Sequence, residues 1–203
     1  MSMKIDKNYL LEFEKKVASL FNQGKIKAPV HLSNGGEDEL IEIFSKIKED
    51  DYVFSTWRSH YHALLKGIPP EIILSDILAG NSISLNFPQY NFYTSAIVGT
   101  HIPVSVGVAF ALKNQNSINR VWCFLGDMAS ETGIAQTSFK YALRWKLPIS
   151  FIIEDNNLSV CTETRKIWNT EFLTYQELKL PNVISYSLNS KYPHAGAGVR
   201  VQF

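Results

Sequence analysis

Residues 121–162, VWCFLGDMASETGIAQTSFKYALRWKLPISFIIEDNNLSVCT, contain the clearest structural pattern in the chain. It begins with a short apolar run, 121–125, without polar alternation, as is typical of a parallel strand buried on both faces. Apolar residues then recur at helical spacing over 130–146, and Pro148 closes that helix before a second apolar run at 149–153. This order predicts a βαβ unit, whose two strands are parallel and joined by a right-handed crossover.

Polar residues follow both predicted strands at the point where each strand ends. Gly126 and Asp127 follow the first, and the cluster EDNN, residues 154–157, follows the second. Ligands of parallel sheets collect beyond the carboxyl ends of the strands. Neighbouring parallel strands would therefore bring the Asp127 carboxylate close to Asn156.

One carboxylate, one amide oxygen and one free loop carbonyl make an oxygen-only half-shell for a hard cation. Mg²⁺ prefers such ligands and usually takes the remainder from phosphate and water. The turn at Gly126 and the start of the following helix offer free N–H groups to the same anion. The residues thus predict a Mg²⁺-diphosphate site, and two ordinary polar turns are the alternative interpretation.

Composition and charge narrow the class of protein. The chain has 203 residues, of which 45% are hydrophobic and 19% charged, as is ordinary for one globular domain. We expect a single domain over 1–203 with an N-terminal helical segment at about 1–30. The formal net charge of +1 gives no reason to expect nucleic acid as a partner. Neither a membrane span nor a cleavable signal is visible, so we expect a cytoplasmic protein.

Three segments resemble a known family. The glycine-aspartate pair, with an asparagine-containing loop one βαβ unit later, resembles the thiamine diphosphate motif of the transketolase-like superfamily. ALRWKLPISFIIEDN, residues 142–156, is similar to a segment of the alpha subunits of thiamine-dependent 2-oxoacid dehydrogenases. HLSNGGEDELIEIF (31–44) and AIVGTHIPVSVGVAFALK (96–113) resemble that family's HLxxGQEA and GIVGxQxPxxxGxAxA. The resemblance implies an α/β fold, a mostly parallel sheet flanked by helices, that binds thiamine diphosphate.

The resemblance also implies roles for the residues of the motif. Asp127 and Asn156 become Mg²⁺ ligands and cofactor contacts, and the carbonyl of Leu158 is the third ligand. Asp155 stands where the first of two paired asparagines is usual.

The turn over the diphosphate would consist of Gly126, Met128 and Ala129 together with the metal-binding aspartate. Met128 stands where the family usually has glycine. A Cβ restricts φ where glycine does not, so the turn geometry is a specific question for the structure.

A second anion-binding segment is WRSH, residues 57–60, after a short predicted strand. A guanidinium pairs well with phosphate oxygens, although a surface arginine beside helix-face histidines explains the same letters. The segment resembles the family's YRxH, which implies that Arg58 holds the diphosphate and that Trp57 replaces the usual tyrosine. His60, with His62 as the alternative, would face the thiazolium and the substrate.

Residues 96–99, among them Ile97 and Val98, would approach the aminopyrimidine of the cofactor through backbone groups. His101 stands where glutamine is common, and we assign it a catalytic role. We interpret 81–93, which is polar and aromatic without a period, as an active-site loop.

Outside these segments the pattern predicts ordinary elements. Ser33 or Asn34 can cap a helix with an acidic first turn. His194 is interpreted as a turn or interface residue. We further expect an amphipathic helix at 6–22 and a last strand at 182–188. Between them, we expect 163–181 to be a loop ordered by diphosphate or by a partner.

The predicted function is an alpha-type subunit of a thiamine diphosphate-dependent enzyme that decarboxylates a small 2-oxo acid and transfers the acyl group. In this superfamily the activating glutamate comes from a second, pyrimidine-binding module. We therefore expect a beta-type partner subunit in an α₂β₂ assembly. One alternative is the N-terminal subunit of a split transketolase or acyloin-type synthase. Another is a non-catalytic binding or regulatory subunit that has kept the fold.

Overall fold

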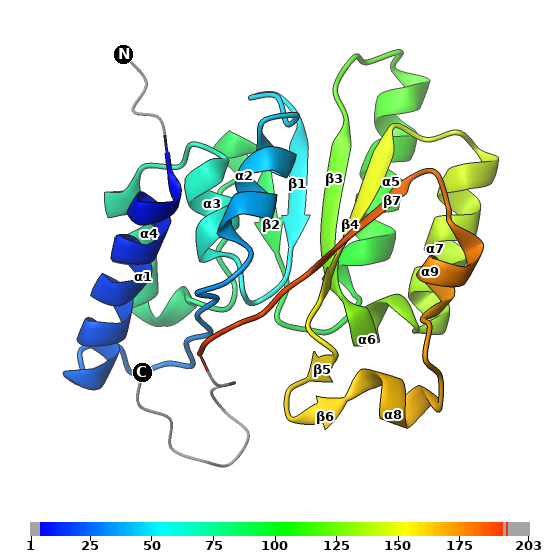
Figure 1. Cartoon of the computed structure of the whole chain (residues 1–203). Coiled ribbons are helices and arrows are strands. Elements are labelled where there is room, and N and C mark those ends of the chain that lie inside the picture. The colour runs from blue at the N-terminus through cyan, green and yellow to red at the C-terminus, as the bar shows by residue number, and fades with distance from the viewer. Residues whose placement is uncertain (1–4, 193, 195–203) are drawn as a thin grey trace.

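The computed structural model describes residues 5–192 and 194. Residues 1–4 of the expected N-terminal helical segment lie outside this part. The elements, labelled in Figure 1, are α1 (Lys7–Asn22), α2 (Glu37–Phe44), β1 (Tyr52–Ser55), α3 (His60–Leu65), α4 (Pro70–Asp76), the π-helical turn η1 (Ile77–Asn81), the 3₁₀ turn η2 (Pro88–Tyr90), β2 (Phe92–Thr94), α5 (His101–Asn114), β3 (Val121–Gly126), α6 (Asp127–Ser130), α7 (Gly133–Arg144), β4 (Ile149–Asp155), β5 (Leu158–Ser159), β6 (Thr162–Glu163), α8 (Thr164–Trp168), α9 (Thr174–Leu178) and β7 (Val183–Ser187).

Five strands form one parallel sheet in the order β2-β1-β3-β4-β7, which confirms the predicted α/β fold (Figure 1). The chain runs from β1 to β2 on one side and then returns through α5 to place β3 on the other side of β1. The strand order therefore reverses between β1 and β3. In sheets of this kind such a reversal opens a crevice beyond the carboxyl ends of the strands.

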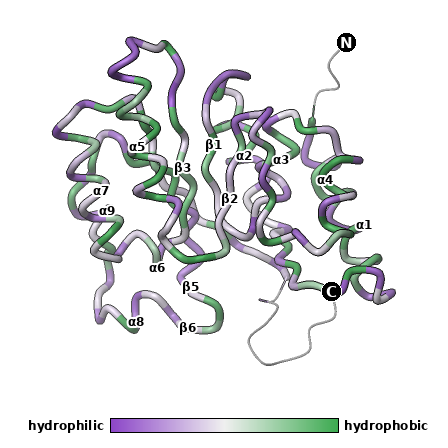
Figure 2. The backbone as a smooth tube through the Cα atoms, turned by 180° about the vertical axis from the view of Figure 1, so that it is seen from behind, coloured by the Kyte–Doolittle hydropathy of each residue, from purple (hydrophilic) through white to green (hydrophobic). Residues whose placement is uncertain are grey.

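Helices cover both faces of the sheet (Figures 1 and 2). Trp122 and Phe124 point to the face covered by α1, α2 and α3. Cys123 and Leu125 point to the face covered by α5 and α7. Successive strand residues face opposite sides, so a strand packed on both sides must be apolar throughout. That requirement explains the apolar run at 121–125 in β3 and the largely apolar one at 149–153 in β4, which Ser150 interrupts. No helix in the described part of the chain is long and apolar enough to cross a membrane.

The βαβ unit is present as predicted, except that its helix is broken. The expected helix at 130–146 is instead α6 and α7, separated by Glu131 and Thr132. The Thr132 hydroxyl donates to the carbonyl of Ala129 at 2.7 Å and accepts from the N–H of Ala135 at 3.4 Å. A threonine that caps a new helix adopts an extended backbone, which interrupts the first one.

Three other predictions are wrong. Residues 81–93 are not an active-site loop, because Leu85 and Phe87 are buried in the core and the segment leads into β2 at the sheet edge. The expected loop at 163–181 contains α8 and α9. Neither predicted residue caps α2, which begins after Gly36 at φ 75° without a side-chain cap.

Candidate functional site

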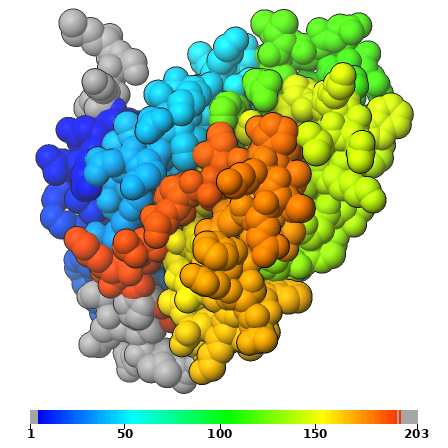
Figure 3. All heavy atoms as spheres, turned by 45° about the vertical axis from the view of Figure 1, so that its right-hand side comes forward, coloured from blue at the N-terminus to red at the C-terminus, as the bar shows by residue number. Residues whose placement is uncertain are grey.

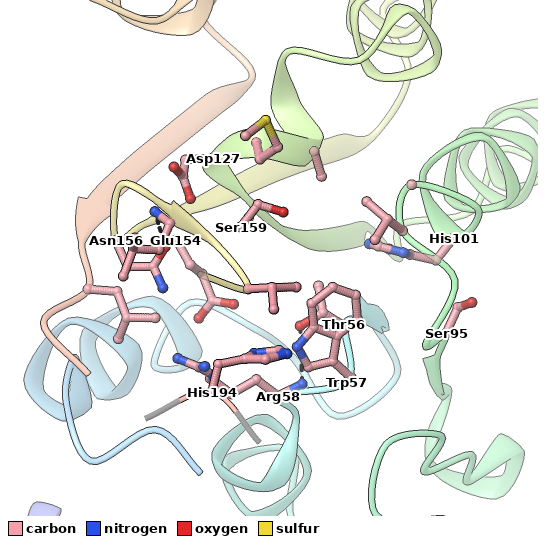
Figure 4. Close-up of a pocket in the computed structure, with 18 residues that line it drawn as sticks. Thr56, Trp57, Arg58, Ser95, His101, Asp127, Glu154, Asn156, Ser159 and His194 are labelled. Atoms are coloured by element: carbon pink, nitrogen blue, oxygen red, sulfur yellow. Dashed lines mark hydrogen bonds between the residues drawn. The ribbon is translucent and has the colours of Figure 1, made fainter. Parts of the chain in front are cut away.

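A cavity opens at the carboxyl edge of the sheet, where the strand order reverses. Residues that follow all five strands line it: Thr56 follows β1, Ser95 β2, Asp127 β3, Asn156 β4 and Leu188 β7. Figure 4 shows Thr56, Ser95, Asp127 and Asn156 around this cavity, each on a different element. The parallel sheet thus brings together residues that are far apart in the sequence.

Most of the residues that the sequence predicted for the site line this cavity. Ile97 and His60 do not. The Ile97 side chain is 69% exposed and lies outside the cavity. The predicted residues that line it are Trp57, Arg58, Val98, His101, Gly126, Asp127, Met128, Ala129, Asn156 and Leu158.

Asp127 is the most unusual group in the cavity. Its side chain is 1% exposed, and neither carboxylate oxygen has a hydrogen-bond partner among the described residues. Burial raises the pKa of Asp127 to about 6. Each buried acceptor without a partner costs about 1–3 kcal/mol. This carboxylate therefore destabilises the folded chain unless a ligand binds it. The Thr164 side chain and the charge of Arg165 lower this pKa without closing a hydrogen bond to either oxygen, so a cation would supply the partner that the carboxylate lacks.

Asn156 and Leu158 line the same cavity as Asp127 and could add an amide and a carbonyl oxygen to its carboxylate. The Asn156 Oδ1 accepts from the N–H of Leu158 at 3.0 Å, which fixes the amide side chain. One lone pair of that oxygen stays free. Asp127 and Asn156 lie next to each other in Figure 4. The described residues hold no cluster of three or more His, Cys, Asp or Glu side chains that suits a metal. A hard cation fits here only with amide, carbonyl and ligand oxygens, the set that Mg²⁺ accepts.

Met128 has an ordinary helical backbone in α6 and is not among the residues with positive φ. The glycine usual in the family is therefore not required by the backbone at this position. The Met128 sulfur instead accepts a hydrogen bond from the Trp168 indole N–H at 3.2 Å. This contact ties α8 to the turn above the cavity.

Asp155 has no part in the cavity, because the chain itself binds it. Arg165 donates to both carboxylate oxygens, at 3.0 and 2.6 Å, and the Tyr175 hydroxyl donates at 2.6 Å. Burial raises the pKa of Asp155, but these hydrogen bonds outweigh it and the net pKa lies below the ordinary value. Asp155 holds α8 and α9 against the sheet.

Glu154, for which the sequence suggested no separate role, lines the cavity opposite Arg58 (Figure 4). Its Oε1 is 3.2 Å from the His62 Nε2 and accepts from the Tyr186 hydroxyl at 2.5 Å. The His62 Nδ1 is 2.6 Å from the Ser55 hydroxyl. Burial raises the pKa of Glu154, but His62 and Tyr186 shift it below the ordinary value. The carboxylate is thus held charged near the guanidinium.

The histidines predicted to be catalytic occupy different environments. His101 lines the cavity, and its Nε2 lies 2.8 Å from the carbonyl of Phe124. A carbonyl only accepts, so the proton is on Nε2 and the lone pair on Nδ1. That Nδ1 is buried without a partner among the described residues. His60 is enclosed in the core, where its Nε2 lies 2.9 Å from the Ser82 hydroxyl.

Sequence reasoning missed a histidine pair at the cavity wall. The His194 ring stacks on His31 with 4.4 Å between centroids and lies edge-on to Trp57 at 6.3 Å. His194 lines the cavity. Its place beside His31 depends on the path of the C-terminal segment, and no local pattern indicates it.

Comparison with known proteins identifies the family of the chain. Residues 6–177 match the model of the family described as "Dehydrogenase E1 component". A pyruvate dehydrogenase E1 component subunit alpha of Rickettsia prowazekii is 32% identical over 167 residues, 77% of this chain and 51% of the relative. The Porphyra purpurea protein of that name is 31% identical over 165 residues, which are 73% of this chain and 48% of the relative. The chain spans about half the length of these relatives. It belongs to the dehydrogenase E1 component family.

Proposed function

We propose that the chain is the diphosphate-binding, alpha-type subunit of a thiamine diphosphate-dependent enzyme that decarboxylates a 2-oxo acid and transfers the acyl group. The observation that carries this proposal is the buried Asp127 carboxylate, unpartnered among the described residues, in a cavity that Asn156, Leu158 and Arg58 also line. Family membership supports the cofactor, and the names of the relatives support the reaction. The cytoplasmic location stays a prediction, since one relative is mitochondrial.

The proposal gives each group a task. Asp127, Asn156 and the Leu158 carbonyl hold Mg²⁺, and Arg58 and the backbone around Gly126 bind the diphosphate. When bound, thiamine diphosphate supplies an electron sink beside the substrate carbonyl.

The remaining polar groups orient the cofactor and the substrate. Of residues 96–99, Val98 and Gly99 line the cavity, and their backbone groups would contact the aminopyrimidine. His101 presents a neutral Nδ1 that accepts a hydrogen bond or a proton. Of the two histidines predicted to be catalytic, only His101 lines the cavity, so the proposal gives no catalytic role to His60.

A beta-type partner subunit completes the site in this proposal. Glu154 is the only glutamate among the described residues that line the cavity, and His62 and Tyr186 already bind it. The glutamate that activates the pyrimidine must therefore come from elsewhere. Val98, which lines the cavity, is 50% exposed, and Val104 in α5 is 57% exposed. These side chains suit contact with a pyrimidine-binding subunit, in an α₂β₂ assembly in which residues 1–203 form one domain.

The same site suits the N-terminal subunit of a split transketolase or acyloin-type synthase. His194, which stacks on His31, adds a polar group to the cavity wall, and this favours a hydroxylated carbonyl substrate. A diphosphate site does not distinguish these reactions, because substrate contacts lie elsewhere.

Assay of the chain co-purified with its pyrimidine-binding partner tests the proposal. We expect 2-oxoacid decarboxylation that needs both subunits, Mg²⁺ and thiamine diphosphate. The Arg58→Ala variant should lose it, and Cys161→Ser, at an exposed position, should keep it. Ketol transfer between sugars without decarboxylation would favour the second function. Turnover by the isolated chain, or none by a folded and cofactor-loaded complex, would contradict the proposal.

A further inference from the structure

Glu14 is a buried carboxylate that does not itself line the cavity. It lies in α1 and is 1% exposed. Its two oxygens accept from the N–H groups of Ser33 and Asn34, each at 2.8 Å. A buried carboxylate normally pairs with a cation, whereas this one binds two successive amides of a loop. Glu14 therefore fixes the backbone of the segment that we call the 31–36 loop.

The C-terminal segment holds the opposite side of the 31–36 loop. The Ser190 hydroxyl donates to the carbonyl of Ser33 at 2.7 Å, and the N–H of Lys191 donates to the carbonyl of Asn34 at 3.1 Å. A Cβ on Gly35 would lie 2.3 Å from the Asn189 carbonyl oxygen. Figure 3 shows this C-terminal band crossing the molecule. The loop is thus clamped between α1 and residues 189–191.

The 31–36 loop begins at His31, which contacts two residues of the cavity wall. His31 stacks on His194 at 4.4 Å and lies 6.0 Å from the Trp57 ring, measured between centroids. Trp57 and His194 both line the cavity. A shift of the loop at Ser33, only two residues from His31, would displace both rings. The same shift would release residues 189–191, which lead to His194.

We propose that Glu14 is a positioning residue for the cavity. Its carboxylate fixes the 31–36 loop, and through that loop it holds His31 and His194 in their stacked arrangement at the wall. This inference concerns the cavity itself and holds whichever ligand and reaction the cavity serves.

The protonation state of Glu14 offers a means of testing this role. Burial raises the pKa of Glu14 to about 7, against the lowering effect of the two loop amides. The other groups that face it are Tyr61 and Arg58, and the Tyr61 hydroxyl also donates to Glu37 at 3.3 Å. A protonated carboxyl turns one acceptor into a donor. One loop amide then loses its partner, so the loop should loosen as the pH falls below about 7.

Global stability should respond to Glu14 in the opposite direction. A folded pKa above the ordinary value of 4.5 means that the folded state binds the proton more tightly than the unfolded state does. The stability contributed by this group is therefore lost as the pH rises through about 7. The positioning role and a merely structural role thus predict opposite pH profiles.

Amide exchange and histidine ring signals, followed by NMR below and above about pH 7, provide the test. In Glu14→Gln we expect about tenfold or more loss of protection at Ser33 and Asn34, because hydrogen bonds to a charged group are lost. The ring signals of His31 and His194 should shift. In the wild type, loop protection should rise with pH, whereas in Glu14→Gln it should stay flat.

The matched control is Glu12→Gln, on the exposed side of the same helix, where Glu12 pairs only with Lys15. It should leave the loop and the ring signals unchanged. Equal effects of the two variants would overturn the proposal, as would unmoved histidine signals in Glu14→Gln. A uniform loss of protection through β3 and β4 would also overturn it, since Glu14 would then only stabilise the fold. The measurement uses no cofactor, so failure of the proposed function does not affect it.

Discussion

Two aspartates stand at the carboxyl ends of neighbouring strands, and their surroundings differ completely. Asp155 accepts hydrogen bonds from Arg165 and Tyr175. Asp127 has no partner among the described residues although it is almost fully buried. Buried polar groups in proteins are nearly always paired, so an unpaired carboxylate in a cavity is a candidate ligand-binding group. A satisfied carboxylate supports the fold, and an unsatisfied one marks the site.

The largest effect on stability should come from removing Asp155. The Asp155→Ala variant leaves Arg165 without its carboxylate, and we expect a loss of about 2–4 kcal/mol in the free energy of unfolding. Urea denaturation measures it. Glu42→Ala, which removes only an exposed pair with Lys46, is the control and should cost less than about 0.5 kcal/mol. Equal losses would show that the two ion pairs do not differ as described.

Removing Asp127 should act in the opposite direction. Without ligand, Asp127→Ala eliminates a buried charge that has no partner in the described structure, and we expect a gain of about 1–3 kcal/mol. Each kcal/mol corresponds to a melting temperature about 2–4 °C higher for a chain of this size. Asp127→Asn, whose amide is also unpaired, should gain less. A lower melting temperature for Asp127→Ala would contradict the comparison.

The smallest effect should come from restoring the family's glycine. Met128→Gly loses the contact with Trp168 and adds backbone freedom within α6, which costs about 1 kcal/mol. Cofactor affinity should stay close to that of the wild type, because Met128 needs no special φ. Met128→Leu is the control for the sulfur contact. A large gain in affinity for the glycine variant would show that Met128 distorts the site.

Features that follow from a local sequence pattern could be predicted, among them the position of Asp127 at the end of its strand. Two apolar runs around a helical period specify a βαβ unit, and that unit places Asp127 and Asn156 together. The same reasoning grouped Asp155 with them, because no sequence pattern near Asp155 indicates that Arg165 binds its carboxylate. The break in the predicted helix was missed because the apolar spacing continues past Thr132.

Long-range contacts could not be predicted in the same way. Glu14 binds the amides of Ser33 and Asn34, which the sequence suggested as helix caps. Glu14 lies too far from them along the chain for a local pattern to indicate these hydrogen bonds. His194 reaches the cavity only because Ser190 and Asn189 dock on the 31–36 loop. Such contacts depend on how separate elements pack, which no periodicity within one element records.

Calorimetric titration of Mg²⁺ and thiamine diphosphate into the chain, co-purified with its partner, tests the central claim about Asp127 most directly. We expect saturable, Mg²⁺-dependent binding by the wild type and by Asp155→Asn, if the latter is folded at the assay temperature. For Asp127→Ala, affinity should fall by about 100-fold or more, because a direct ligand matters at least as much as an outer-shell group. Wild-type affinity in the Asp127→Ala complex would contradict the account.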